Sequence, residues 1–176
     1  SWQRGTPAGA VINSAGAGTQ SYTTSLIGSY NSSELSYLES PCLDLSSTLS
    51  PQVRFKIWWD TERNWDGLQL QSSIDGGSTW SVVGAVNSPL GLNWYNTTLA
   101  NGPGMGMACW SGSQNSFPSS GSGGWVTAQH PLTGLAGLSG VKFRFVFVSD
   151  ASVQNDGVAI DDFRVSDPPP VEAELV

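Results

Sequence analysis

The segment 53–83, VRFKIWWDTERNWDGLQLQSSIDGGSTWSVV, decides the fold class that this sequence predicts. Apolar and polar side chains alternate along 53–60 and again along 68–74, which is the period of a strand with one buried face. The tetrapeptide 75–78, DGGS, supplies the glycines that a tight reversal needs, and a further strand is expected to begin at Thr79. We therefore expect three consecutive antiparallel strands, a β-meander, within an all-β fold.

Length and composition indicate one domain with little helix. The chain has 176 residues, which is enough for a single core. Charged residues are only 12% of the sequence, and that composition suits short strands joined by polar loops better than surface helices. The net charge of −7 argues against a nucleic-acid partner, because a phosphate-binding surface needs a surplus of Lys and Arg. An excess of carboxylates is better suited to binding a cation such as calcium.

The domain limits follow from the remaining pattern. Strands are expected at 125–132, 141–148 and 157–165, whereas 84–124 is predicted to be mostly loop. Three prolines then prevent further strand pairing, so we expect one domain at residues 1–166 and a Pro-rich linker or tail at 167–176. No stretch resembles a membrane span or a signal peptide. We expect a mature or excised piece of a secreted, extracellular or cell-surface protein.

The two cysteines, Cys42 and Cys109, leave two alternatives open. They form either one disulfide or two unreactive buried thiols, and their separation in sequence does not decide between these. If the compartment is oxidising, we predict that they pair and tie the 84–124 region to an early strand. Such a bridge would stabilise the fold by about 4 kcal/mol in the chain-entropy model.

No catalytic motif is present. The sequence lacks a nucleophile elbow, a zinc-protease helix motif and a phosphate loop. A Ser-His-Asp triad would have to use His130, the single histidine, which is interpreted as a surface or capping residue. A glycoside hydrolase or lyase remains an alternative, because paired carboxylates perform that chemistry. The candidates for such a pair are Asp60, Glu62, Asp66, Asp161 and Asp162.

The acidic residues gather in two segments, 60–75 and 150–162, each beside an expected strand. Calcium binds carboxylate and carbonyl oxygens collected from several loops, so the pattern predicts a calcium site. The alternative is that the Asp-Gly pairs beginning at Asp66, Asp75 and Asp156 simply form turns. Asp161 and its neighbour Asp162 differ, because adjacent residues of a strand point to opposite faces. One of these two carboxylates is expected near the core, where it needs a partner.

A ligand-binding face is also predicted from strand parity. Trp58 shares the outward face of its strand with Arg54 and Lys56, opposite to the apolar face. If the 141–148 strand lies beside this one, a polar sheet face with one indole results, and such faces bind sugars. The predicted ligand-binding residues are Arg54, Lys56, Trp58, Gln69, Gln71 and Arg144, with Lys142 beside them. A merely solvated face is the alternative.

An ordered series of motifs carries a family resemblance over about residues 34–165. The motifs are LESPCLD at 38–44, WDGLQLQSSIDGGSTW at 65–80, NWY at 93–95, WSG at 110–112, WVTA at 125–128, FRF at 143–145, SD at 149–150 and DGVAIDDF at 156–163. In this order they resemble the MAM-like jelly-roll modules of secreted bacterial proteins. They are similar to the accessory domains found beside immune inhibitor A-type peptidases.

The resemblance implies an antiparallel two-sheet β-sandwich of the jelly-roll type with an accessory role in adhesion or glycan contact. It also implies a cation near the last strand, held by Asp161 or Asp162 with Glu39 as a partner. The chain departs from the animal MAM pattern in having two cysteines rather than four. We expect a non-catalytic, glycan-directed binding or adhesion module of a larger secreted protein, whose partners are a polysaccharide or cell-surface glycan and neighbouring domains. The alternative is a structural spacer beside a peptidase or glycosidase.

Overall fold

The computed structural model describes residues 2–169, and no helix occurs among them. Accordingly, this part of the chain contains no helix that is long and apolar enough to cross a membrane. The strands are β1 (Gln3–Gly5), β2 (Ser21–Thr23), β3 (Leu35–Glu39), β4 (Gln52–Asp60), β5 (Gly67–Ser73), β6 (Ser81–Val82), β7 (Thr97–Thr98), β8 (Ala108–Cys109), β9 (Val126–Pro131), β10 (Lys142–Val148) and β11 (Gly157–Ser166).

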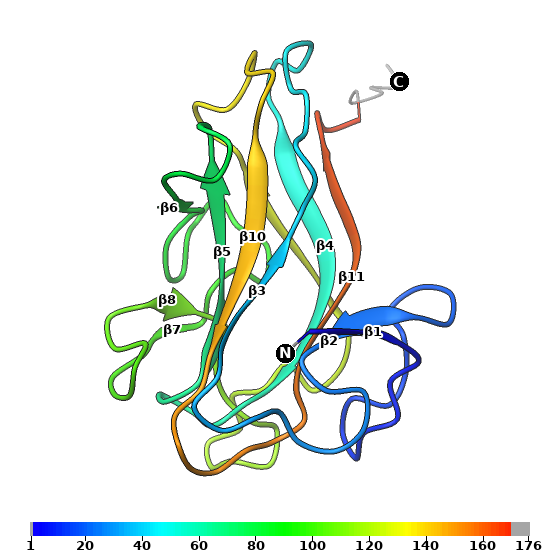
Figure 1. Cartoon of the computed structure of the whole chain (residues 1–176), viewed down its shortest axis with the longest axis vertical. Helices are drawn as coiled ribbons and strands as arrows, with labels where there is room; N and C mark the ends of the chain where they lie inside the picture. The colour runs from blue at the N-terminus through cyan, green and yellow to red at the C-terminus, as the bar shows by residue number, and fades with distance from the viewer. Residues whose placement is uncertain (1, 170–176) are drawn as a thin grey trace, which may run out of the picture.

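Two antiparallel sheets contain most of these strands (Figure 1). The five-stranded sheet has the order β1-β2-β11-β4-β9, and the four-stranded sheet has the order β3-β10-β5-β6. Strands β7 and β8 form a small separate hairpin beside β5. The two larger sheets enclose one apolar core between them, so the expected all-β sandwich architecture is confirmed.

The alternation along 53–60 identified the buried face of β4 correctly. Val53, Phe55, Ile57 and Trp59 are all at most 8% exposed. The predicted meander is wrong, however, because β4 pairs with β11 and β9, whereas β5 pairs with β10 and β6. The connection at 61–66 thus crosses from one sheet to the other. Alternation shows which face of a strand is buried, and strands of two opposed sheets bury their faces in the same core.

The core is built around aromatic rings from both sheets and from the long loop region. The ring of Phe55 on β4 lies 5.0 Å from that of Phe145 on β10, in an edge-to-face arrangement. Trp94 and Trp110 contact the same ring at 5.9 and 5.7 Å. Both tryptophans belong to the 84–124 region, which forms little regular structure, as predicted. This region nevertheless provides much of the core.

The two cysteines are free thiols, so the disulfide alternative is not realised. Cys109 on β8 is fully buried, but Cys42 lies exposed in the segment after β3, so the alternative of two buried thiols is wrong for Cys42. Cys109 packs with Leu99 against Val146 and Val148 of β10. The β7–β8 hairpin therefore covers one end of the outer surface of the four-stranded sheet through apolar contacts.

The last strand contains an irregularity that the sequence pattern did not predict. The register between β11 and β4 shifts between Asp161 and Arg164, and Asp162 has a φ of 50°. Beyond the shift, the strand continues to Ser166, close to the predicted domain end. The carboxylate of Asp167 then accepts hydrogen bonds from the amides of Leu49 and Ser50. Residues 170–176 of the predicted tail lie outside the described residues.

Candidate functional site

Three carboxylates meet where the two sheets are connected. Glu62 and Asp66 belong to the loop between β4 and β5, and Asp150 belongs to the loop between β10 and β11. One carboxylate oxygen from each lies within 4.8 Å of the other two. Both loops are at the same end of the sandwich, at the bottom of Figure 1. We call these three residues the acidic cluster; they come from the two acidic segments from which the sequence predicted a calcium site.

Asp66 is the buried anchor of the acidic cluster. Its side chain is completely enclosed. Oδ2 accepts a 2.6 Å hydrogen bond from the hydroxyl of Tyr30, and Oδ1 accepts a 2.8 Å bond from the amide of Asp150. Gly67 follows without a positive φ, and a Cβ there would lie 2.7 Å from Sγ of Cys109. The Asp66-Gly67 pair is therefore a close-packed strand start, whereas Gly76 and Gly77, at φ 76° and 100°, do form the predicted turn.

The electrostatics of the acidic cluster disfavour three negative charges. Burial, followed by the charges of Asp150 and Asp66, raises the pKa of Glu62 to about 6. Burial also raises the pKa of Asp66 to about 6, although the bonds from Tyr30 and from the Asp150 amide act in the opposite direction. Oε2 of Glu62 is buried without a hydrogen-bond partner in the described part of the chain. A positively charged group at this point would relieve both the repulsion and the missing contact.

Hard oxygen ligands of this kind suit a calcium ion. Calcium takes 6–8 oxygen ligands, which carboxylates, backbone carbonyls and water supply together. Three carboxylates from two loops offer the charged part of such a set. The sequence pointed to both segments, but the family resemblance favoured different residues of the second one.

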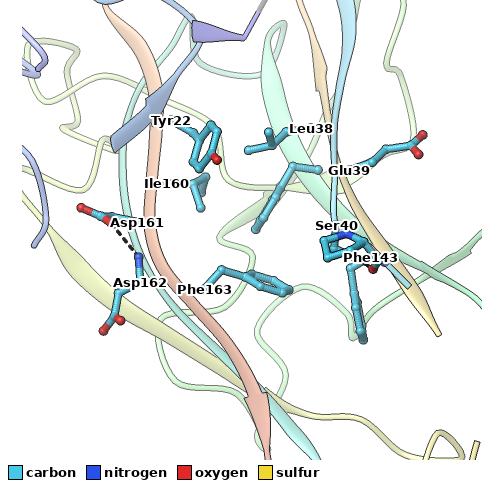
Figure 2. A pocket seen from close by; sticks show the side chains of 11 residues that line it. Tyr22, Leu38, Glu39, Ser40, Phe143, Ile160, Asp161, Asp162 and Phe163 are labelled. Atoms are coloured by element: carbon cyan, nitrogen blue, oxygen red, sulfur yellow. Dashed lines mark hydrogen bonds between the residues drawn. The ribbon is translucent and has the colours of Figure 1, made fainter. Parts of the chain in front are cut away.

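The metal ligands that the resemblance implied do not come together. Asp161, Asp162 and Glu39 all line one largely apolar pocket of about 220 Å³ between the sheets. In Figure 2 the carboxylate of Glu39 points away from those of the two aspartates. Glu39 pairs with Lys142 at 3.1 Å, and Asp162 pairs with Arg164 at 2.7 Å.

One of the adjacent aspartates was expected near the core, but neither side chain is fully buried. Both aspartates are half-buried. Oδ2 of Asp161 accepts a 2.8 Å hydrogen bond from the amide of Ala17. The positive φ of Asp162 and the register shift break the strand alternation, so Phe163 turns inward instead. Its ring lies 5.8 Å from that of Phe145.

The predicted ligand-binding face is divided between two surfaces. Arg54, Lys56 and Trp58 lie on β4 in the five-stranded sheet, whereas Gln69, Gln71 and Arg144 lie on β5 and β10 in the other sheet. The assumption that the 141–148 strand lies beside β4 is therefore wrong. Trp58 is half-buried and contacts Trp125 at 6.1 Å, and the amine of Lys56 donates to the carbonyl of Gly16. The N-terminal loop thus occupies this side.

The outer surface of the four-stranded sheet keeps half of the predicted residues and adds aromatic rings. One row across the four strands consists of Glu39, Arg144, Gln71 and Val82, which are direct cross-strand neighbours. The guanidinium carbon of Arg144 lies 4.6 Å from the ring centre of Tyr37 and 4.2 Å from that of Trp80. We call this surface the Arg144 face; it comprises Tyr37, Glu39, Gln71, Trp80, Val82, Lys142 and Arg144.

The Arg144 face is open because the β7–β8 hairpin covers only its neighbouring end. Val146 and Val148, which follow Arg144 on the same side of β10, are buried under Leu99 and Cys109. Tyr37 and Val82 remain 44% and 49% exposed. The sequence assigned Gln71 and Arg144 to a binding surface, but the pairing of β10 with β3, which brings Tyr37 there, carried no local signal.

His130 was expected to be a surface or capping residue, but it does not lie on the surface. It is 7% exposed, and its ring lies 4.8 Å from that of Trp94. Nδ1 lies 2.8 Å from the carbonyl of Pro131, and Nε2 lies 2.9 Å from the hydroxyl of Ser88. With Nδ1 donating to the carbonyl, Nε2 accepts from Ser88. These contacts involve no carboxylate of the described residues, so the Asp of a triad is missing.

No protein-family model matches this chain, and a search of curated proteins found no match.

Proposed function

We propose that the chain is a non-catalytic binding module of a larger extracellular or cell-surface protein, and that the Arg144 face binds a glycan. The observation that carries the proposal is the position of two aromatic rings beside hydrogen-bonding side chains on an uncovered sheet surface. Aromatic rings offer apolar area to a sugar ring, and amide and guanidinium groups pair with its hydroxyls. We also propose the jelly-roll strand connection that the resemblance to MAM-like modules implies.

The contacts within the Arg144 face support a binding surface better than a merely solvated one. Oε1 of Gln71 accepts from Nε of Arg144 at 2.8 Å, and Nε2 of Gln71 donates to Oε1 of Gln69 at the same distance. Nε2 of Gln69 in turn donates to the carbonyl of Ala108 at 2.9 Å. This chain of bonds fixes side chains that would otherwise be mobile on a sheet surface. Binding then costs less conformational entropy.

Two matched tyrosine substitutions test the glycan proposal. Tyr37 is 44% exposed on the Arg144 face, and Tyr22 is 42% exposed on the other sheet. On an array of neutral and acidic polysaccharides, we expect binding by the wild type and by Tyr22→Ala and loss of signal with Tyr37→Ala. Melting curves verify that each variant is folded. If the wild type binds no glycan, the spacer alternative replaces the proposal, and equal losses in both variants would place the site elsewhere.

We further propose that the acidic cluster binds one calcium ion. The specific observation is the buried, unpaired Oε2 of Glu62 beside Asp66 and Asp150. A cation bound only by the folded state stabilises it, by about 2.7 kcal/mol at a concentration 100 times its dissociation constant. Because both loops connect the two sheets, the ion would hold the sheets together at this end.

Calcium titration with thermal unfolding tests this second proposal. We expect calcium to raise the melting temperature of the wild type, chelator to reverse the effect, and Asp150→Asn to abolish it. Asp162→Asn is the matched control, because Asp162 belongs to the ligand set that the resemblance implied. Abolition by Asp162→Asn alone would instead place the ion near the last strand. If calcium does not change the melting temperature of the wild type, the proposal of a calcium site is wrong.

A further inference from the structure

The guanidinium of Arg144 is held in place by three contacts within the Arg144 face. Tyr37 comes from β3 on one side of β10, and Trp80 precedes β6 on the other side. Their ring centres lie 4.6 and 4.2 Å from the guanidinium carbon. Nε donates to Gln71 at 2.8 Å. Each cation–π contact stabilises the guanidinium where it lies, so the group has a preferred position.

Of the guanidinium donors, Nε is bound to Gln71, and the other two nitrogens have no protein partner among the described residues. Glu39 is the direct cross-strand neighbour of Arg144, yet its carboxylate pairs with Lys142 at 3.1 Å. Within residues 2–169, no acceptor contacts Nη1 or Nη2 of Arg144, and no carboxylate forms an ion pair with it. These two nitrogens carry four N–H groups in one plane.

This arrangement matches the recognition of an oxyanion. A guanidinium binds a carboxylate through two parallel N–H···O bonds, and the charge makes them shorter and stronger than neutral bonds. Because Lys142 is neutralised by Glu39, Arg144 is the only unpaired cation of the Arg144 face as defined here. The chain as a whole carries a charge of −7, which repels densely charged polyanions. One carboxylate at a time suits this surface better than a highly sulfated chain.

We propose that Arg144 is the specificity-determining residue for a uronic acid, whose carboxylate accepts from Nη1 and Nη2 while Tyr37 and Trp80 hold the guanidinium. This inference rests on the proposed glycan-binding function and narrows it to polysaccharides that contain uronic acids. The sugar hydroxyls contact the neighbouring amide of Gln71. Fixing the guanidinium in advance lowers the entropic cost of the two-point contact.

Paired ligands separate this inference from the proposed function. The probes are short oligosaccharides of galacturonic, glucuronic and mannuronic acid, each used as the free acid and as its methyl ester, at constant calcium. Loss of two charge-assisted hydrogen bonds weakens binding about 10- to 100-fold. By titration calorimetry we expect the wild type to prefer at least one acid over its ester by this factor. Arg144→Gln should lower acid binding to the level of ester binding, so that the preference disappears.

Two further variants make the result specific. Arg144→Lys keeps the charge but loses the planar fork, so most of the preference should still be lost. Arg54→Gln removes an exposed arginine from the other sheet and should behave as the wild type. Equal binding of acid and ester by the wild type would refute the role of Arg144 and leave glycan binding intact. No binding of any acid or ester, together with a blank polysaccharide array, would refute both.

Discussion

The hydroxyl of Tyr30 donates a 2.6 Å hydrogen bond to Oδ2 of Asp66. The same hydroxyl accepts a 3.1 Å hydrogen bond from the amide of Glu62, so one phenol contacts two members of the acidic cluster. Burial, together with the hydrogen bond to Asp66, holds the pKa of Tyr30 well above its usual range, and the proton therefore stays on the phenol. This bond joins the segment before β3 to the connection between the two sheets.

Replacing Tyr30 with phenylalanine tests the contribution of that bond. The ring of Tyr30 packs edge-on against Phe147 at 5.1 Å, and phenylalanine keeps this contact. Removing the hydroxyl leaves the buried Oδ2 of Asp66 without its donor, which we expect to cost about 1–3 kcal/mol of unfolding free energy. Denaturant unfolding provides the measurement. The hydroxyl of Tyr22 forms no hydrogen bond in the described part of the chain, so the control variant Tyr22→Phe should change the unfolding free energy little.

The hydrogen bonds of the Asp75 carboxylate should stabilise the fold to an extent that depends on pH. Its carboxylate accepts from the hydroxyl and the amide of Thr79 at 2.6 and 2.9 Å and from Ser73 at 2.7 Å. These bonds, those from Thr79 first, lower the pKa of Asp75 well below its usual range. A lowered pKa gives stability that is fully present above the unfolded-state value, about 4, and is lost as pH falls through the folded-state value.

The variant Asp75→Asn measures this contribution. At pH 7 the wild type should melt at the higher temperature, because asparagine cannot accept all of these bonds. As the pH falls from about 4 towards 2, the unfolded wild type takes up a proton on this carboxyl while the folded state still resists protonation, so the difference should narrow. A difference that stays constant across this range would mean that the charge of Asp75 is not involved.

Thiol titration checks the two free cysteines. Burial raises the pKa of Cys109 to about 12, so almost no thiolate forms there at neutral pH. Cys42 is exposed. An aromatic disulfide reagent should therefore modify one thiol per chain rapidly in the native state and both in denaturant. Detection of no thiol in denaturant without reductant would show that the cysteines are paired after all.

The glycine at the start of β11 should tolerate no side chain. Gly157 has a φ of 99°, and a Cβ there would collide with Oγ1 of Thr24 and approach the ring of Tyr30. We expect Gly157→Ala to cost about 3 kcal/mol or more in unfolding free energy. Gly137 also has a positive φ, 80°, but nothing lies near its position. Gly137→Ala should cost only about 1 kcal/mol of unfolding free energy. Equal costs for the two variants would mean that the positive φ, and not the steric contact at Gly157, accounts for the loss of stability.

The sequence predicted the strands well and their neighbours poorly. Alternation along β4 and β10 identified inner residues such as Phe55 and Phe143, which are both 1% exposed. It could not show that β4 and β5 belong to different sheets, because both strands bury one face in the same core. The division of the predicted ligand-binding face, with Trp58 on one sheet and Arg144 on the other, follows from that one error.

The candidate sites were predictable in part for a similar reason. Local composition marked the two acidic segments, and the fold brings Asp66 and Asp150 together across 84 positions of sequence, as their hydrogen bond records. Asp161 and Asp162 form no cluster with Glu39, and the register of β11 shifts directly after Asp161. A positive φ in a non-glycine residue leaves no mark in the residue pattern. Tyr37 and Trp80 likewise became neighbours of Arg144 only through strand pairing.

The β7–β8 hairpin has a consequence for how a polymer would lie on the protein. Leu99 and Cys109 pack against Val146 and Val148, so the side chains that follow Arg144 on this side of β10 are buried. A saccharide chain running parallel to the strands meets this hairpin at Val146, two residues beyond Arg144 on β10. It must either terminate there or turn across the strands towards β3 or β6. The position of the hairpin would therefore determine whether the module binds the ends of polysaccharide chains or their interior.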